Sequence, residues 1–232
     1  SLAMVLNGLA RGDSRQVYRS FAVRPLDLFN YKALKMFAHG DPAFGYFGPD
    51  RYDAEMFIRF GSDSLNFYEY RQPIHTGWDL LNDMNIVFSE LTSVKAIRDS
   101  VNKLYTQPVR GGPPGATYGI RGNPSLRQIR EISIGVENPA AQGGTRPLVG
   151  QVWVNELRLT DVNNAKGYAY HFDTQVKLAD LGGVSFSYAK TDPNFHALDQ
   201  TFGSHNTTIN WGGNSNVSLD ELFPADWAAT SV

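Results

Sequence analysis

Apolar and polar residues alternate in several short runs of the chain, and turn residues separate these runs. Within Glu55–Gly61, Met56, Ile58 and Phe60 share one face of an extended strand, while the other face is polar or small except for Phe57. Alternation of this kind predicts a strand with one buried face. Comparable runs predict further strands at Val17–Ala22, Ala33–His39, Leu65–Arg71, Met84–Phe88, Gln128–Glu137 and Leu148–Leu159.

A different spacing follows the strand at Met84–Phe88. Apolar residues recur there at intervals of three and four, which predicts a short amphipathic helix with Ser89 or Thr92 as its N-cap. The apolar positions of this helix are Leu91, Val94, Ile97, Val101 and Leu104. The stretch Gln107–Asn123 contains Gly-Gly-Pro-Pro-Gly and is predicted to be a loop.

Seven or more short strands, one helix and frequent turns predict an all-β fold. We expect a jelly-roll-like β-sandwich over residues 1–160. The many Gly, Pro, Phe and Tyr residues agree, because they form turns and fill pleated sheets. Within the strand Leu148–Leu159, Trp153, Leu157 and Leu159 are separated by even numbers of residues and are predicted to share one face. This face either packs in the core or lies at the surface, where Trp153 would be a further candidate binding residue.

The pattern changes after Thr160, and residues 161–232 are predicted to form a second segment. Apolar and polar residues alternate from Tyr168 to Leu178 and again over Val184–Tyr188, which predicts a β-hairpin with one apolar face. A strand of about 11 residues tilted by about 40° rises about 25 Å, the height of the apolar band of a membrane barrel. The hairpin therefore resembles outer-membrane barrel strands, and a half-buried hairpin that extends the sandwich is the alternative.

Charge and residue types exclude several classes of protein. The formal net charge is −2 with both signs mixed along the chain, which gives no basis for binding nucleic acid. The chain has no cysteine, so a disulfide scaffold and thiolate metal sites are excluded. No apolar run reaches the roughly 18 residues of a membrane-spanning helix.

Candidate catalytic carboxylates are Glu69, Glu90 and Glu156, because glycoside hydrolysis needs two acidic side chains. Glu69 and Glu156, however, lie on strands beside Arg71 and Arg158, as solvated ion-paired residues would. The five histidines lack the spacing of zinc ligands. We therefore predict that the protein is not an enzyme.

Two groups of residues are candidates for binding. Aromatic side chains concentrate around the hairpin at residues 55–71, where they either fill the core or stack on sugar rings and partner surfaces. The candidate binding residues are Tyr46, Tyr52, Tyr68, Tyr70 and Trp78. Asp161, Asn163 and Asn164 would supply oxygen ligands to a structural calcium ion, although turns use the same residue types without a metal. No other cofactor is expected.

Three segments carry a resemblance to a known family. They are Ala54–Tyr70, Val176–Gly182 and Gly150–Asp161, the last reading Gly-Gln-Val-Trp-Val-Asn-Glu-Leu-Arg-Leu-Thr-Asp. The chain resembles the SprA/Sov family, which forms the outer-membrane translocon of the type IX secretion system and is linked to gliding motility. The resemblance implies a giant β-barrel, of which this chain would be one domain plus a few strands. It implies no catalytic residues.

The predicted function follows from this resemblance. It is a non-catalytic structural module that contacts other translocon subunits and secreted proteins at the outer membrane and cell surface, and the excised strands would self-associate. A short turn at Asp180–Gly183 and a long connection at Thr191–His205 would place the sandwich on the extracellular side, because short turns of such barrels face the periplasm. The alternative is a cell-surface carbohydrate-binding module with glycan ligands, since Gly150–Leu159 also resembles the last strand of carbohydrate-binding jelly rolls.

Overall fold

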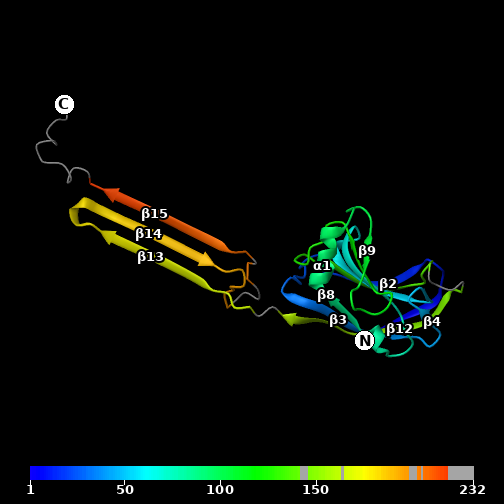
Figure 1. The fold of residues 1–232 in the computed structure, drawn as a ribbon. Coiled ribbons are helices and arrows are strands. Elements are labelled where there is room, and N and C mark those ends of the chain that lie inside the picture. The colour runs from blue at the N-terminus through cyan, green and yellow to red at the C-terminus, as the bar shows by residue number, and fades with distance from the viewer. Residues whose placement is uncertain (142–145, 163–164, 199–202, 205, 219–232) are drawn as a thin grey trace, which may run out of the picture. The chain divides into compact units, whose positions relative to one another are not determined.

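Figure 1 shows the fold in a computed structural model, which describes residues 1–141, 146–162, 165–198, 203–204 and 206–218. The chain divides into unit 1, Ser1–Asn163, and unit 2, Asn164–Val232, close to the change of pattern after Thr160. Strands predominate and the described ranges contain one short α-helix, so the predicted β-rich fold is confirmed. Among the helices in these ranges, none has the length and apolar character needed to cross a membrane.

Unit 1 contains two antiparallel sheets of different size. The four-stranded sheet has the order β1 (Leu2–Leu9), β12 (Leu148–Val162), β3 (Tyr31–Gly40) and β8 (Met84–Val87). The six-stranded sheet has the order β2 (Ser14–Ser20), β11 (Glu131–Glu137), β6 (Glu55–Asp63), β7 (Asn66–Pro73), β10 (Thr117–Arg121) and β9 (Tyr105–Pro108). The connections contain a small sheet of β4 (Tyr46–Gly48) and β5 (Arg51–Tyr52) and the 3-10 helix η1 (Leu80–Asn82).

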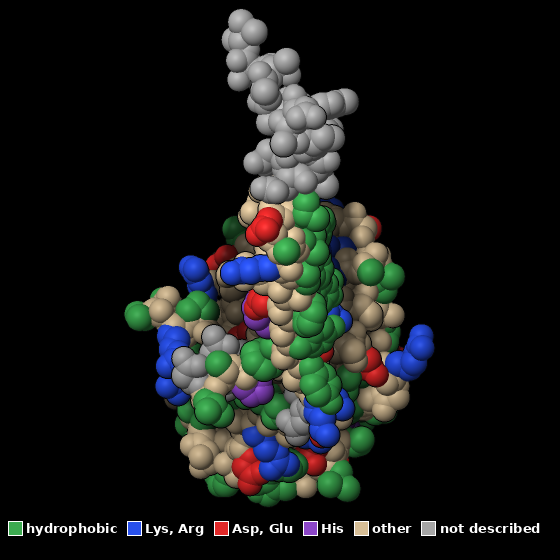
Figure 2. All heavy atoms as spheres, turned by 90° about the vertical axis from the view of Figure 1, so that its left-hand side faces the viewer, with side chains coloured by type: hydrophobic (Ala, Val, Ile, Leu, Met, Phe, Trp, Pro, Cys, Tyr) green, Lys and Arg blue, Asp and Glu red, His purple; other side chains and the backbone are tan. Residues whose placement is uncertain are grey.

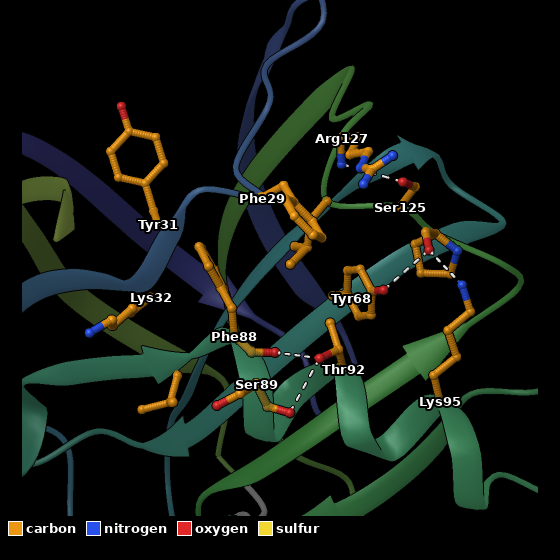
Figure 3. A pocket seen from close by; sticks show the side chains of 13 residues that line it. Phe29, Tyr31, Lys32, Tyr68, Phe88, Ser89, Thr92, Lys95, Ser125 and Arg127 are labelled. Atoms are coloured by element: carbon orange, nitrogen blue, oxygen red, sulfur yellow. Dashed lines mark hydrogen bonds between the residues drawn. The ribbon is translucent and has the colours of Figure 1, made fainter. Parts of the chain in front are cut away.

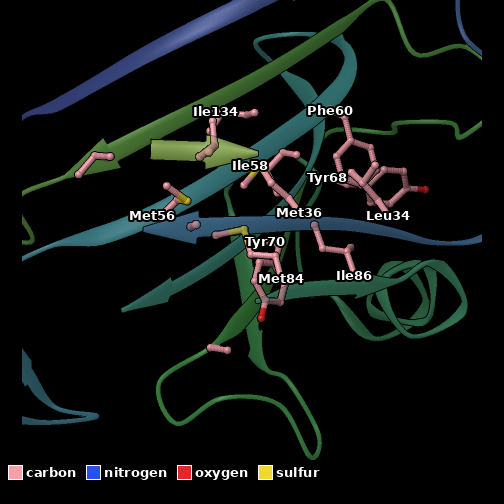
Figure 4. Packing of buried hydrophobic residues seen from close by; sticks show 14 of the residues in the cluster. Leu34, Met36, Met56, Ile58, Phe60, Tyr68, Tyr70, Met84, Ile86 and Ile134 are labelled. Carbon is pink, nitrogen blue, oxygen red and sulfur yellow. The ribbon is translucent and has the colours of Figure 1, made fainter. Parts of the chain in front are cut away.

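The hydrophobic core lies between the inner faces of these two sheets (Figure 4). Met56, Ile58 and Phe60 of β6 point into it and are at most 1% exposed, which confirms the face predicted from their alternation. Leu34 and Met36 of β3 belong to the same cluster and come from the four-stranded sheet. Each buried side chain of this size contributes about 1.5–3 kcal/mol, so the alternation fixes which face of the strand turns inward.

Phe57, on the outer face of β6, is also fully buried. Gly135 of the neighbouring strand β11 leaves room for its ring, because a Cβ at that position would lie 2.3 Å from Cζ of Phe57. The guanidinium groups of Arg59 and Arg71 cover the ring at 4.4 and 5.0 Å from its centroid. Charged side chains, and not a second apolar layer, therefore shield this ring from water.

The same two arginines bind three glutamates on the outer face of the six-stranded sheet. Glu69 of β7 accepts hydrogen bonds from Arg59 and Arg71 and is completely buried. Arg71 also donates to Glu55 at 3.0 Å and to Glu137 at 2.7 Å. The prediction that Glu69 pairs with Arg71 is confirmed, but the pair is buried and not solvated. Burial raises the pKa of Glu55, and the neighbouring Arg71 works against that shift.

Helix α1 (Phe88–Ile97) is shorter than the sequence pattern predicts. The chain leaves the helix at Arg98, which has an extended backbone and donates to the carbonyl of Gly122. Leu104, predicted on the apolar stripe of the helix, lies instead against Gly119 of β10, where a Cβ would meet its Cδ1 at 3.2 Å. The last apolar positions of the stripe therefore belong to the connection that follows the helix.

The predicted N-caps of this helix are wrong as well. Strand β8 leads directly into α1, so its last residue, Val87, occupies the N-cap position without a side-chain hydrogen bond. Thr92 lies inside the helix, and its Oγ1 donates to the carbonyl of Phe88 at 2.8 Å.

The local pattern does not predict six of the strands in the described ranges, β1, β4, β5, β9, β10 and β15 (Thr208–Val217). Strand β10 and half of β9 lie in the stretch predicted to be a loop, and β15 contains Gly212 and Gly213. Strand β1 pairs with β12 and buries Met4 and Leu6 in the core. Each of these strands forms by pairing with a partner strand, a long-range contact that local propensity does not encode.

Unit 2 is a single antiparallel sheet. It has the order β13 (Ala169–Lys177), β14 (Gly182–Thr191) and β15, and the short 3-10 helix η2 (Ala179–Leu181) joins the first two strands. The predicted hairpin is therefore present, and all ten residues of β15 extend it by pairing with β14.

We expect Arg71→Ala to lower the free energy of unfolding by about 3–5 kcal/mol, because Glu69 would lose a partner while it remains buried. Arg158→Ala is the matched control. Arg158 also binds a glutamate two residues away, Glu156, and covers a ring, Phe37, but both partners of this pair are 49% exposed. Arg158→Ala should therefore lower the free energy of unfolding by less than about 1 kcal/mol. Urea unfolding followed by circular dichroism measures both, and equal losses would contradict the buried role of Arg71.

Candidate functional site

Three of the five candidate binding residues are buried. Tyr52, Tyr68 and Tyr70 are 3%, 2% and 1% exposed. Tyr68 and Tyr70 lie on the inner face of β7, opposite Phe60 and Ile58 of β6. The prediction that these three form a binding surface is therefore wrong, because strand alternation and loop packing turn their rings into the protein.

The hydroxyl groups of the three tyrosines bind inside unit 1. The hydrogen bonds run from Tyr52 to Glu55 at 3.1 Å, from Tyr68 to the carbonyl of Pro124 at 3.2 Å and from Tyr70 to Gln72 at 2.8 Å. Burial raises the pKa of each phenol, so all three remain protonated near neutral pH. They act as structural hydrogen-bond donors.

The other two candidates lie at the surface beside histidines. The Tyr46 ring packs on His75 with 4.0 Å between centroids and is partly buried. Trp78 is 55% exposed, and its ring meets His39 of β3 edge-on at 5.2 Å. Burial lowers the pKa of His75, while Asp79 works against that shift.

An aromatic row on the outer face of the four-stranded sheet joins Trp78 to Trp153. The His39 ring stacks on Trp153 of β12 with 5.0 Å between centroids, so the order is Trp78, His39, Trp153. Trp153 is 42% exposed, and its indole nitrogen donates to Gln151 at 3.0 Å.

The prediction that Trp153 and Leu159 share a face is wrong, because a β-bulge lies between them. The register of β12 against β3 shifts between Asn155 and Arg158, and Glu156 there adopts a positive φ of 53°. The extra residue reverses the alternation, so Leu159 turns inward opposite Leu34 while Trp153 faces outward opposite His39.

Buried polar contacts hold Trp78 in this row. The Asn82 side chain is buried, accepts a hydrogen bond from the backbone N–H of His75 at 2.7 Å and donates to the backbone carbonyls of His75 and Gly77. Gly77 and Gly40 of β3 exchange two backbone hydrogen bonds. Position 40 must be glycine, because a Cβ would lie 2.2 Å from the His75 oxygen. The loop that carries Trp78 is thus fixed to the end of β3.

The candidate carboxylates do not form an acid–base pair. Glu69 is ion-paired on the outer face of the six-stranded sheet, and Glu156 binds Arg158 at 2.7 Å in the four-stranded sheet. The third candidate, Glu90, lies in the first turn of helix α1 and accepts from the Tyr118 hydroxyl at 3.5 Å. The three side chains therefore lie in different surroundings and do not converge on one site.

The calcium ligands predicted in the loop after β12 lie mostly outside the described residues. Asn163 and Asn164 are among the residues not described. Asp161 lies near the end of β12 with a φ of 58°, and its Oδ2 accepts from the Thr160 hydroxyl at 3.1 Å. Over the described ranges, no group of three or more histidine and acidic side chains is placed to hold a metal ion.

A hollow of about 560 Å³ opens beside the start of α1 and reaches Tyr68 (Figure 3). Phe29 and Phe88 form apolar walls, and Lys32, Lys95 and Arg127 are the cationic lining residues. Two of these cations are engaged within the protein: Lys95 donates to the Pro124 carbonyl at 3.0 Å, and Arg127 lies 4.5 Å from the Phe29 ring centroid. Burial and the nearby Arg98 lower the pKa of Lys95. None of the residues that line the hollow is acidic or a histidine.

The sheet of unit 2 has one apolar and one polar face. Across its strands Phe172, Tyr188 and Trp211 lie opposite one another, and Figure 2 shows hydrophobic side chains in a stripe along this sheet. Phe172 is 55% exposed and Trp211 75% exposed. The opposite face carries polar residues such as Asp173 and Ser187. Among the described residues of unit 2, none is buried.

Comparison with known proteins identifies one family. The family model SprA_N, described as motility related/secretion protein, matches residues 1–230. Among curated proteins, none matches the chain. The matched residues include both units.

We expect Trp153→Ala to lower the free energy of unfolding by only about 1 kcal/mol, because the ring is half exposed and loses mainly its stacking on His39. Phe60→Ala, in the core between the sheets, should cost about 3–5 kcal/mol. Urea denaturation of both variants checks the difference. A loss above about 3 kcal/mol for Trp153→Ala would place that ring in the core.

Proposed function

The chain belongs to the SprA_N family of motility related/secretion proteins, and on this basis we propose that it is a non-catalytic module of an outer-membrane protein translocon of the type IX secretion system. Unit 2 supplies strands to the membrane barrel, and unit 1 contacts translocon subunits and secreted proteins. The observation that carries the proposal is the apolar face of the three-stranded sheet in unit 2, on which Tyr170, Phe172 and Trp211 are 50%, 55% and 75% exposed.

The dimensions of unit 2 support a membrane role. Its strands have 9, 10 and 10 residues, and a membrane-spanning β-strand needs about 9–11. Apolar and polar residues alternate along its strands, as lipid-facing and lumen-facing residues of a barrel do. A soluble sheet with this pattern requires a second layer to cover the apolar face, as the two sheets of unit 1 cover each other.

The strand order supports the assignment of unit 1 as a jelly roll. Strands β1, β2 and β3 alternate between the two sheets, and β11 and β12 repeat the alternation near the end of the unit. The ion-paired Glu69 and Glu156 and the exposed aromatic row favour contact over catalysis.

The connections of unit 2 support an orientation in the outer membrane. The link between β13 and β14 is the short Leu178–Leu181 stretch, whereas β14 and β15 are joined by residues 192–207. Short turns of such barrels face the periplasm. Strand β13 then descends toward the periplasm, and the sandwich that precedes it in the chain lies on the extracellular side.

Single cysteines test the membrane role, since the chain has no cysteine of its own. Phe172→Cys and Val176→Cys, labelled with an environment-sensitive fluorophore, should shift to the blue when the chain is reconstituted in phospholipid vesicles. The neighbouring Asp173→Cys and Gln175→Cys are the matched controls, and a label there should keep the emission wavelength that it has in water. Equal emission at the four positions, or no transfer of the chain into vesicles, would contradict a membrane strand.

A second candidate function, carbohydrate binding, is favoured by the row of Trp78, His39 and Trp153 with the amide of Gln151 beside it. Indole faces stack on sugar rings. If the row binds glycans, Trp153→Ala should weaken binding of a cell-surface polysaccharide at least about 10-fold in calorimetry without loss of fold. Retention of the polysaccharide by Trp153→Ala, or no binding by the unmodified chain, would remove this candidate.

A further inference from the structure

The sandwich of unit 1 has an apolar cleft along one side. Strand β1 ends the four-stranded sheet there and β2 ends the six-stranded sheet. Arg15 of β2 donates to the Val5 carbonyl of β1 at 3.1 Å, so the two edges lie close together at one end. Beyond this contact a cleft of about 500 Å³ opens between the sheets.

The cleft reaches the hydrophobic core. Leu28, Leu34 and Ile134 line it and are at most 8% exposed. At its mouth, Val17 of β2 and Leu157 of the β12 bulge are 38% and 42% exposed. Aliphatic side chains in contact with water favour an apolar occupant, because each Å² of apolar surface that is removed from water contributes about 25 cal/mol to binding.

Strand β2 offers backbone groups beside this cleft. Within the described part of the chain β2 pairs only with β11, and all seven of its residues are exposed. The N–H and C=O groups on its other side are therefore positioned to pair with an added strand. Such a strand would lie over the mouth of the cleft and direct every second side chain into it.

Two arginines flank the position of Val17. Arg15, Val17 and Arg19 share the inner face of β2, because they lie opposite Val136, Ile134 and Ile132 of β11. Arg19 covers the Phe21 ring at 5.3 Å, and neither arginine has a carboxylate partner among the described residues. The face thus presents an apolar position between two positive charges.

We propose that this cleft binds an extended strand of a partner protein in which an aliphatic residue has Asp or Glu two positions before it and two positions after it. The strand pairs with β2, the aliphatic side chain enters the cleft opposite Val17, and the carboxylates lie opposite Arg15 and Arg19. Directly opposed residues of paired strands make the closest side-chain contacts, so the spacing of the charges selects the sequence. This inference rests on the protein-contacting role proposed for unit 1 and does not need the membrane role of unit 2.

The test uses the whole 232-residue chain and a labelled, end-blocked peptide, Ser-Glu-Thr-Val-Thr-Glu-Ser, in fluorescence anisotropy at low salt. We expect saturable binding that weakens at least about 10-fold when the peptide valine becomes serine. Arg19→Glu should weaken binding of the original peptide by a similar factor, since an attraction becomes a repulsion. Arg110→Glu, at an exposed arginine beside the opposite edge of the same sheet, is the matched control and should leave binding unchanged.

Two further measurements separate a specific site from a loss of fold. Two further peptides each carry Lys in place of one of the two Glu residues. The peptide whose Lys lies opposite position 19 should bind the Arg19→Glu variant at least about 10-fold more tightly than the original peptide does. Which of the two peptides this is shows the direction of the bound strand. Leu157→Trp, which fills the cleft, should abolish binding while circular dichroism keeps its β-sheet spectrum. No saturable binding by the chain, equal weakening by Arg19→Glu and Arg110→Glu, or no recovery with either Lys peptide would overturn the proposal. The cysteine-labelling result in vesicles is independent of these outcomes, so failure of the cleft and failure of the membrane role are distinguishable.

Discussion

Every large sheet of this protein has an apolar face, and the way that face is covered determines what each unit is able to do. In unit 1 the inner faces of two sheets cover each other, and Ile58 and Leu34 lie in one core with almost no exposure. In unit 2 a single sheet presents Phe172 and Trp211 at its surface. Because the hydrophobic effect penalises such a face in water, this face of unit 2 favours an apolar contact.

The outer face of the six-stranded sheet also carries an apolar ring that must be covered, and charged side chains cover it. Phe57 is apolar and points away from the core, and Arg59 and Arg71 cover it with their guanidinium planes. The cost of burying these charges is offset by Glu69, which accepts from both. Both carboxylate oxygens of Glu69 are therefore engaged by arginine. The surfaces left for contact are the aromatic row of Trp78, His39 and Trp153, the hollow beside α1 and the cleft at the edge of the sandwich.

The sequence predicts the fold wherever alternation and local turns decide it. The inward face of Met56, Ile58 and Phe60 is confirmed, as are the hairpin of unit 2 and the predominance of strands. Predictions fail where a distant partner decides. Strand β15 contains adjacent glycines and forms by pairing with β14, which a local pattern does not reveal. One extra residue in the bulge of β12 reverses the face of Trp153.

Among the candidate binding residues, too, some positions follow from local alternation and others depend on distant strands. Tyr68 and Tyr70 follow the strand alternation that places Phe67 and Glu69 on the other face, and that alternation could have assigned both to the core. Trp78 is exposed as predicted, but its neighbours His39 and Trp153 come from β3 and β12, which only the folded sheet brings together. The arginines beside Val17 become a candidate contact only once β2 is known to be a sheet edge.

The membrane role proposed for unit 2 can be tested with lipids brominated on their acyl chains, which quench tryptophan on contact. Two single-tryptophan variants suffice, one that retains only Trp211 of unit 2 and one that retains only Trp153 of unit 1; both rings are exposed. In vesicles of brominated lipid, emission from Trp211 should be strongly quenched and emission from Trp153 should be unchanged. Quenching of both to the same extent, or of neither, would contradict the assignment of unit 2 to the membrane and of unit 1 to water.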